Sequence, residues 1–235
     1  RDVERSRGLG DVYKRQVGTI LRVAFLIVVG LNAILWLFRA ETLTNLVVRI
    51  ILSALGVVFG FLVTIYPGIM LSFARGHPLW GSPVFPWVIS VSGMISGLAI
   101  AAFAIPILGV FIPRLTPSLL EARRTVTIHR IPERVGLYAS ILIVVELALT
   151  GAYLASVAGV PGAVNLTANL LISTFFWGGF IFLGLILPLI IYILERLRLG
   201  IPVSVWIIVL YICFILMAVG AVAGRYALLA AGQLI

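Results

Sequence analysis

Glu146 is the side chain with the clearest potential for chemistry in this chain of 235 residues. It is the only acidic residue inside an apolar run, and it lies near the middle of that run. A charge at the centre of a bilayer costs about 2.5–3.5 kcal/mol on insertion scales, so such residues usually face a polar interior or a proton path. Thr150 and Tyr153 follow at i+4 and i+7 and share its helical face. Two interpretations remain open: a proton relay, or a protonated side chain hydrogen-bonded to a neighbour for packing.

Tyr66 is the second candidate, and it stands directly before Pro67 and Gly68 near the end of another apolar run. Proline removes a backbone donor and frees a carbonyl, which opens the helix where a phenol could hydrogen-bond a ligand. Trp80 and Trp87 flank the proline-rich loop that follows, as aromatic residues do at membrane interfaces. These residues alone fit either a ligand site or a kinked helix end with interfacial anchors.

The histidines and the single cysteine exclude several cofactors. A b-type heme within a membrane usually needs paired histidines on facing helices, whereas His77 and His129 lie in loops. Cys213 alone cannot form an intrachain disulfide, a Cys-bound iron–sulfur cluster or a zinc finger. We therefore expect no heme and no metal in this chain.

Other polar and small residues within the apolar runs are interpreted mainly as packing devices. Arg225 can snorkel to the interface as an anchor, with a counter-ion for Glu146 or a ligand contact as alternatives. We expect interhelical hydrogen bonds from Asn32, Ser90, Ser92 and Ser96. Glycines four residues apart allow close helix contacts. These pairs are Gly56 and Gly60, Gly93 and Gly97, and Gly220 and Gly224.

The elements that position these residues must be transmembrane helices. The chain is 62% hydrophobic and 11% charged, which is more apolar surface than a soluble domain can bury. A spanning helix needs about 20 apolar residues, and runs of this length exceed barrel strands. Helices are predicted at about 17–38, 46–72, 84–112, 135–158, 169–194 and 203–231. The predicted fold class is an all-α membrane protein, a polytopic helical bundle.

Residues 1–16 differ from the rest, since they hold eight of the 25 charged residues and end where the apolar pattern begins. They resemble neither a signal peptide nor a transit peptide. We predict that residues 1–16 are a non-native leader joined to a truncated reading frame, and that residues 17–235 form the transmembrane bundle.

The arginine distribution predicts the orientation of the bundle. After residue 16, nine arginines fall at one set of helix ends, and two, Arg75 and Arg225, fall at the other. The nine are Arg39, Arg49, Arg114, Arg123, Arg124, Arg130, Arg134, Arg196 and Arg198. The positive-inside rule then places the basic 113–134 loop in the cytoplasm and residues 75–83 and 159–168 outside. The net charge of +9 thus reflects orientation rather than nucleic-acid binding.

Four stretches together carry a family resemblance: YPGIMLS from Tyr66, PLWGSPVFPW from Pro78, VSGMISGLAI from Val91 and GRYALLAAGQ from Gly224. In them the chain resembles the polysulfide reductase membrane-subunit family, also called NrfD-like. The match covers the second and third predicted helices and, more loosely, the C-terminus. The resemblance implies a bundle of eight or more helices without heme, of which six are present here.

The resemblance also implies a quinone near the outer face and electron exchange there with a separate iron–sulfur subunit. Tyr66 matches the family tyrosine that hydrogen-bonds the quinone head group, and Pro67 and Gly68 belong to the same motif. The Asn and His that complete the family site lie on a first helix with no counterpart in this sequence. Glu146 fits a proton-handling role but matches no family motif.

These inferences together predict a quinone-interacting membrane subunit of a respiratory oxidoreductase, which is not catalytic alone. It would lie in a bacterial or archaeal cytoplasmic membrane and bind menaquinone or ubiquinone. Its expected partners are a ferredoxin-like iron–sulfur subunit on the outer face, a catalytic subunit reached through it, and membrane lipid, with no nucleic acid. The alternatives are a secondary transporter, which should show internal repeats and broken helices around midplane charges, and a purely structural anchor.

Overall fold

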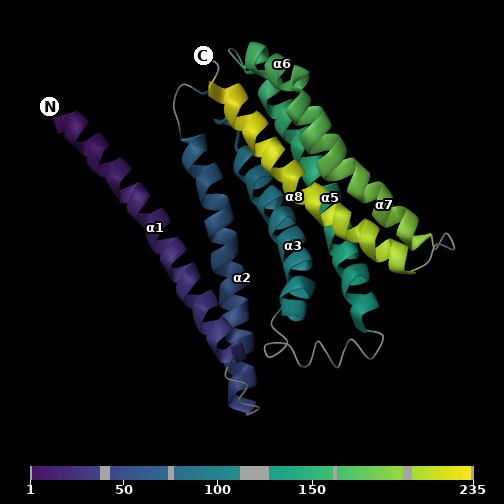
Figure 1. The fold of residues 1–235 in the computed structure, drawn as a ribbon. Helices are drawn as coiled ribbons and strands as arrows, with labels where there is room; N and C mark the ends of the chain where they lie inside the picture. The colour runs from purple at the N-terminus through teal and green to yellow at the C-terminus, as the bar shows by residue number, and fades with distance from the viewer. Residues whose placement is uncertain are drawn as a thin grey trace. The chain divides into compact units, whose positions relative to one another are not determined.

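A computed structural model describes residues 2–37, 43–73, 77–111, 127–160, 163–197 and 203–233, and every regular element within them is a helix (Figure 1). The α-helices are α1 (Asp2–Leu37), α2 (Leu43–Ser72), α3 (Phe85–Phe111), α5 (Thr127–Ala158), α6 (Val164–Ile172), α7 (Leu187–Arg196) and α8 (Val203–Gln233). A π-helix, η1 (Phe175–Ile186), lies between α6 and α7. The predicted all-α class is therefore confirmed.

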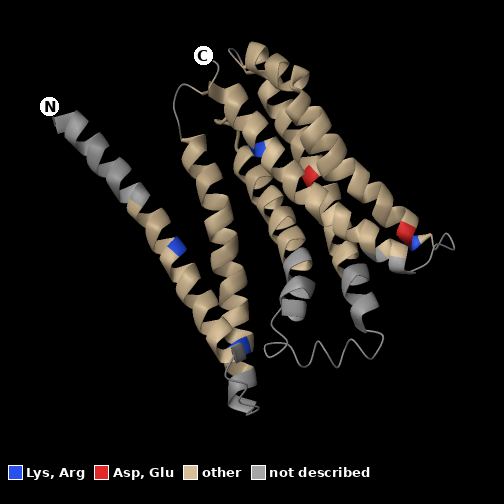
Figure 2. Cartoon of the chain, in the orientation of Figure 1, with Lys and Arg blue, Asp and Glu red and all other residues tan. Residues whose placement is uncertain are grey.

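Six spans within the described residues are long and apolar enough to cross a membrane. They are Gln16–Leu35, Val47–Ser72, Phe85–Ala102, Val135–Ala158, Phe175–Arg196 and Ile208–Gln233. Charged residues, coloured in Figure 2, are sparse along these helices. Chains of this kind satisfy their backbone hydrogen bonds within each helix, which is why they can span lipid. The predicted polytopic bundle is confirmed on this basis.

Two helices extend beyond the apolar runs from which they were predicted. α1 begins at Asp2, inside the stretch interpreted as a leader, and α5 begins at Thr127 rather than at 135. Hydropathy marks the part of a helix that suits lipid, whereas the hydrogen-bonded helix continues through polar residues that suit water. That residues 1–16 are a non-native leader stays a prediction.

The fifth predicted helix, 169–194, is divided in the structure. α6 ends before Ser173, whose backbone is extended, and η1 and α7 then continue to Arg196. Pro188 lacks an N–H and so interrupts the α-helical hydrogen-bond pattern at the junction of η1 and α7. The spanning part of this region is Phe175–Arg196, so α6 precedes the span instead of forming its first turns.

The chain forms two compact units, residues 1–67 and 68–235. In the first unit, α1 and α2 are joined by polar contacts as well as packing. The Asn32 amide donates to Ser53 Oγ at 2.9 Å, which confirms the predicted interhelical hydrogen bond of Asn32. Arg49 donates to the Leu35 carbonyl at 2.7 Å, near the C-terminal end of α1, where carbonyls lack helical partners.

The second unit is organised around α8, which packs against η1, α3 and α7 (Figure 1). α8 and η1 approach closely at glycines. A methyl group on Gly184 would lie 2.8 Å from the Cα of Gly220, and one on Gly224 would meet the Phe180 ring. The predicted role of Gly220 and Gly224 in close packing is thus confirmed, whereas a methyl group on Gly97 would meet nothing within 4 Å.

Candidate functional site

Residues 77–84, which precede α3, lie at one end of the second unit and are hydrogen-bonded to the C-terminal turns of α8. We call this end of the unit the 77–84 end. His77 Nδ1 donates to the Gly232 carbonyl at 2.7 Å, because a carbonyl oxygen can only accept. Trp80 Nε1 donates to the Leu228 carbonyl at 3.3 Å, and its ring stacks on His77 with centroids 4.3 Å apart. The Gly232 carbonyl, one of the last four of α8, gains a hydrogen-bond donor in this way.

The C-terminal part of α5 joins the same end. Tyr153, which is fully buried, donates its hydroxyl to the Leu79 carbonyl at 3.0 Å and packs against Phe85. Ser156 Oγ and Ser82 Oγ are hydrogen-bonded at 2.6 Å. Three segments distant in sequence, residues 77–84, α5 and α8, therefore meet at the 77–84 end.

Deeper in this unit, five polar residues from three packed helices form what we call the polar cluster: Ser92, Ser96, Glu146, Thr150 and Arg225. Glu146 is fully buried, and Ser92 and Thr150 are nearly so. Arg225 donates to Ser96 Oγ at 3.2 Å, which links α8 to α3, and it interacts electrostatically with Glu146 on α5. α3 packs against both α5 and α8, so the three helices enclose the cluster.

Most of the polar cluster's atoms lack hydrogen-bond partners within the described chain. Both carboxyl oxygens of Glu146, Thr150 Oγ1, Ser92 Oγ and Arg225 Nε are buried without one. Buried polar groups in proteins are nearly always satisfied, and ordered water supplies the partner where the chain does not. Among the described residues, Glu146 makes no hydrogen bond to a neighbouring side chain, and both the relay and the packing interpretations stay predictions.

Arg225 was interpreted from the sequence as an interfacial anchor, with a counter-ion for Glu146 or a ligand contact as alternatives. It is half-buried, and its guanidinium bonds Ser96 inside the unit. Its electrostatic interaction with Glu146 agrees with the counter-ion alternative. That Arg225 also anchors α8 at the membrane interface stays a prediction.

Tyr66 lies in the first compact unit. It is half-buried in α2, and its ring lies against Gly18 of α1, where a side chain on Gly18 would overlap it. α2 continues through Pro67 to Ser72, and the boundary between the two units falls directly after Pro67. In the second unit, Gly68 lies close to α3, because a methyl group on it would be 2.6 Å from the Cα of Pro86.

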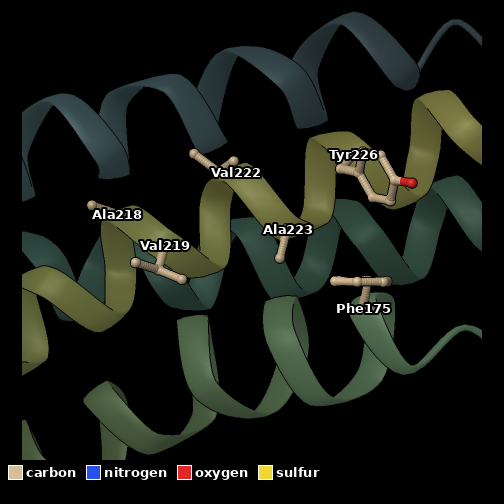
Figure 3. Close-up of a pocket in the computed structure, with 6 residues that line it drawn as sticks. All are labelled: Phe175, Ala218, Val219, Val222, Ala223 and Tyr226. Carbon is tan, nitrogen blue, oxygen red and sulfur yellow. The ribbon is translucent and has the colours of Figure 1, made fainter.

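An apolar groove of about 490 Å³ runs between α8 and η1 (Figure 3). It is lined by Phe175, Ala218, Val219, Val222, Ala223 and Tyr226. Phe175 and Tyr226 meet edge to face at one end, with centroids 5.3 Å apart. Since its lining presents almost only carbon, the groove suits an apolar chain. The chemistry-bearing residues of this unit lie in the polar cluster instead.

The helices and the polar cluster define a polytopic helical membrane protein with an acidic residue, Glu146, and an arginine, Arg225, among its helices. A family model described as polysulphide reductase, NrfD, matches residues 11–235, and the chain belongs to this family. The resemblance inferred from the sequence is thereby confirmed. The family comprises membrane subunits of polysulphide and related reductases, and it is associated with quinone. No curated protein and no solved structure matches the chain.

Proposed function

We propose that this chain is the quinone-interacting membrane subunit of a multi-subunit respiratory oxidoreductase, and that it passes electrons between the quinone pool and an iron–sulfur partner subunit. The observation that carries the proposal is the family match over residues 11–235. Quinol oxidation releases two electrons and two protons, so it needs hydrogen-bonding groups at the ring oxygens, a proton acceptor and an electron acceptor. A ferredoxin-like partner supplies the electron acceptor in this proposal, and menaquinone or ubiquinone is the donor.

Tyr66, with Pro67 and Gly68 beside it, is the proposed quinone contact. Its phenol can donate to a quinone carbonyl or accept from a quinol hydroxyl. Because Pro67 has no N–H, the carbonyl of Val63, four residues earlier, loses its usual helical donor and is available as a further acceptor. Glu146 is the proposed proton relay, since it is the acid buried within the spanning helices of the second unit.

Tyr66→Phe should lower the rate of quinol oxidation by up to about tenfold, because one hydrogen bond contributes about 0.5–1.5 kcal/mol. The measurement is quinol oxidation by the complete complex with its iron–sulfur partner, reconstituted in vesicles. Tyr138→Phe is the matched control, since Tyr138 is exposed on a spanning helix. If Tyr66→Phe and Glu146→Gln both leave the rate unchanged, the assignment of these residues is wrong. Substrate uptake by vesicles without any partner would instead favour a secondary transporter.

We place the chain in a bacterial or archaeal cytoplasmic membrane, with the 77–84 end outside and the partner docked there. Single cysteines at Gly81 and Ser118, in a Cys213→Ala chain, should be labelled from opposite sides by an impermeant reagent. Gly81 is exposed and has room for a side chain, whereas Ser82 is buried. Ser118 lies outside the described residues, in the basic 113–134 segment. Labelling of both from the same side would contradict the topology.

A further inference from the structure

Polar residues on α5 continue from Glu146 toward the 77–84 end. Glu146, Thr150, Tyr153 and Ser156 are spaced by four, three and three residues, which keeps them on one helical face. Glu146 lies near the middle of the span Val135–Ala158, and Ser156 lies near its end. Ten residues of α-helix rise about 15 Å, so this face leads from mid-span to the end of the bundle.

The groups along this face connect to the surface. Thr150 Oγ1 is one helical turn from Glu146 and has no hydrogen-bond partner among the described residues, and the Tyr153 hydroxyl donates to the Leu79 carbonyl. Ser156 bonds Ser82 and is itself exposed, so the polar face continues to the surface of the unit at the 77–84 end. Ser96 and Arg225 add polar groups to the polar cluster from α3 and α8.

On the other side of Glu146 the buried positions are apolar. The next ones on α5 are Ile143 and Ala139, both fully buried, and Ala99 of α3 and Met217 of α8 are buried as well. Tyr192, further along, already donates its hydroxyl to the Met217 sulfur at 3.3 Å. The described residues therefore offer polar groups on one side of Glu146 and an apolar barrier on the other.

We propose that the polar cluster and the α5 face line a water-filled path that opens only at the 77–84 end and stops at Glu146. Water in this path would satisfy the five buried polar atoms that have no partner in the described part of the chain. It would also bridge Glu146 and Arg225, which interact electrostatically without a direct hydrogen bond between them. Glu146 consequently exchanges protons with one side of the membrane alone.

The charges around Glu146 allow this exchange. Loss of its proton to water leaves a carboxylate, which the permanently charged Arg225 balances, and return of the proton restores the neutral acid. α3, α6 and η1 carry no acidic or basic side chain. The remaining titratable side chains on helices packed against α5 are Tyr192, Glu195 and Arg196 of α7, and Tyr211, Cys213 and Tyr226 of α8. Among these side chains, Arg225 is the charged neighbour that interacts electrostatically with Glu146.

Accessibility of single cysteines tests the path. In a Cys213→Ala chain, Thr150→Cys should react with silver ion, a small impermeant thiol reagent, when it is added in chloride-free buffer at the 77–84 end. The reaction of Thr150→Cys with silver ion should be at least about tenfold slower when the reagent is added from the opposite side. The extent of reaction is measured as protection of the thiol from later alkylation. Ile143→Cys, one turn beyond Glu146, is the matched control and should stay unreactive from both sides. Ser96→Cys on α3 serves if Thr150→Cys does not fold.

The path is wrong if Thr150→Cys and Ser96→Cys stay unreactive while Ser156→Cys reacts, or if Ile143→Cys reacts as fast as Thr150→Cys. Equal reaction of Thr150→Cys from both sides would also overturn it. The relay role of Glu146 rests on the proposed function, whereas the labelling needs neither quinone nor partner. One-sided labelling with unchanged quinol oxidation in Glu146→Gln would therefore remove the relay and leave the path in place.

Discussion

Gly220→Leu is expected to prevent α8 from packing on η1 and to leave little folded protein in the membrane. A methyl group on Gly220 would overlap the backbone of Gly184, and backbone atoms cannot move aside as the end of a flexible side chain can. Overpacked interiors usually lose about 1–3 kcal/mol, and a backbone clash at the closest helix contact should exceed about 3 kcal/mol. The effect should be large because α8 and η1 form the main helix pair of the second unit.

The measurement is the free energy of unfolding in detergent micelles, together with the amount of protein recovered from membranes. Gly97→Leu is the matched control, because Gly97 lies in a spanning helix of the same unit and a methyl group there meets nothing within 4 Å. It should change the free energy of unfolding by less than about 0.5 kcal/mol. Equal losses in Gly220→Leu and Gly97→Leu would show that the close approach of Gly184 and Gly220 does not hold the helices together.

Hydropathy predicted the class and the spans because lipid imposes one simple requirement on each segment. A run such as Val135–Ala158 must be apolar over its length and helical throughout, and both properties can be seen in the sequence. The extension of α5 back to Thr127 could not be predicted in this way, because the charged turn before residue 135 meets no such requirement.

The division of the fifth predicted helix depends on tertiary contacts that hydropathy does not measure. An apolar run fits one continuous α-helix as well as it fits the observed break at Ser173 followed by the π-helix η1. The contact between Gly184 and Gly220 fixes where η1 must approach α8, and this pairing joins residues that are distant in the chain. Pro188, which the prediction of one helix at 169–194 did not take into account, lies where η1 gives way to α7.

The polar cluster was predictable in part. Helical periodicity placed Thr150 on the face of Glu146, since the two lie four residues apart on one helix. The meeting of this face with Ser96 and Arg225 depends on how α3 and α8 are aligned against α5, which no pattern within one helix contains. Ser92 and Ser96 are four residues apart, and that spacing was the available signal for a polar face on α3.

Glu146→Leu is expected to cost more stability than Arg225→Leu, although both remove one member of the same pair. Without Glu146, the guanidinium of Arg225 stays charged inside the bundle, because arginine does not lose its proton in proteins. Without Arg225, the Glu146 carboxyl can take up a proton and become neutral. We expect a loss of about 2–3 kcal/mol for Glu146→Leu and about 1 kcal/mol for Arg225→Leu.

The double variant Glu146→Leu, Arg225→Leu should be more stable than Glu146→Leu alone, because it leaves no unpaired charge and replaces both polar groups with apolar ones. The free energy of unfolding of the four chains in micelles gives the coupling, which should reach at least about 1 kcal/mol. Glu146→Gln keeps the shape of the side chain and removes only its charge, so a loss close to that of Glu146→Leu would assign the effect to charge. If the losses of unfolding free energy are additive, or if Arg225→Leu loses more than Glu146→Leu, a group outside the polar cluster balances the charge of Arg225.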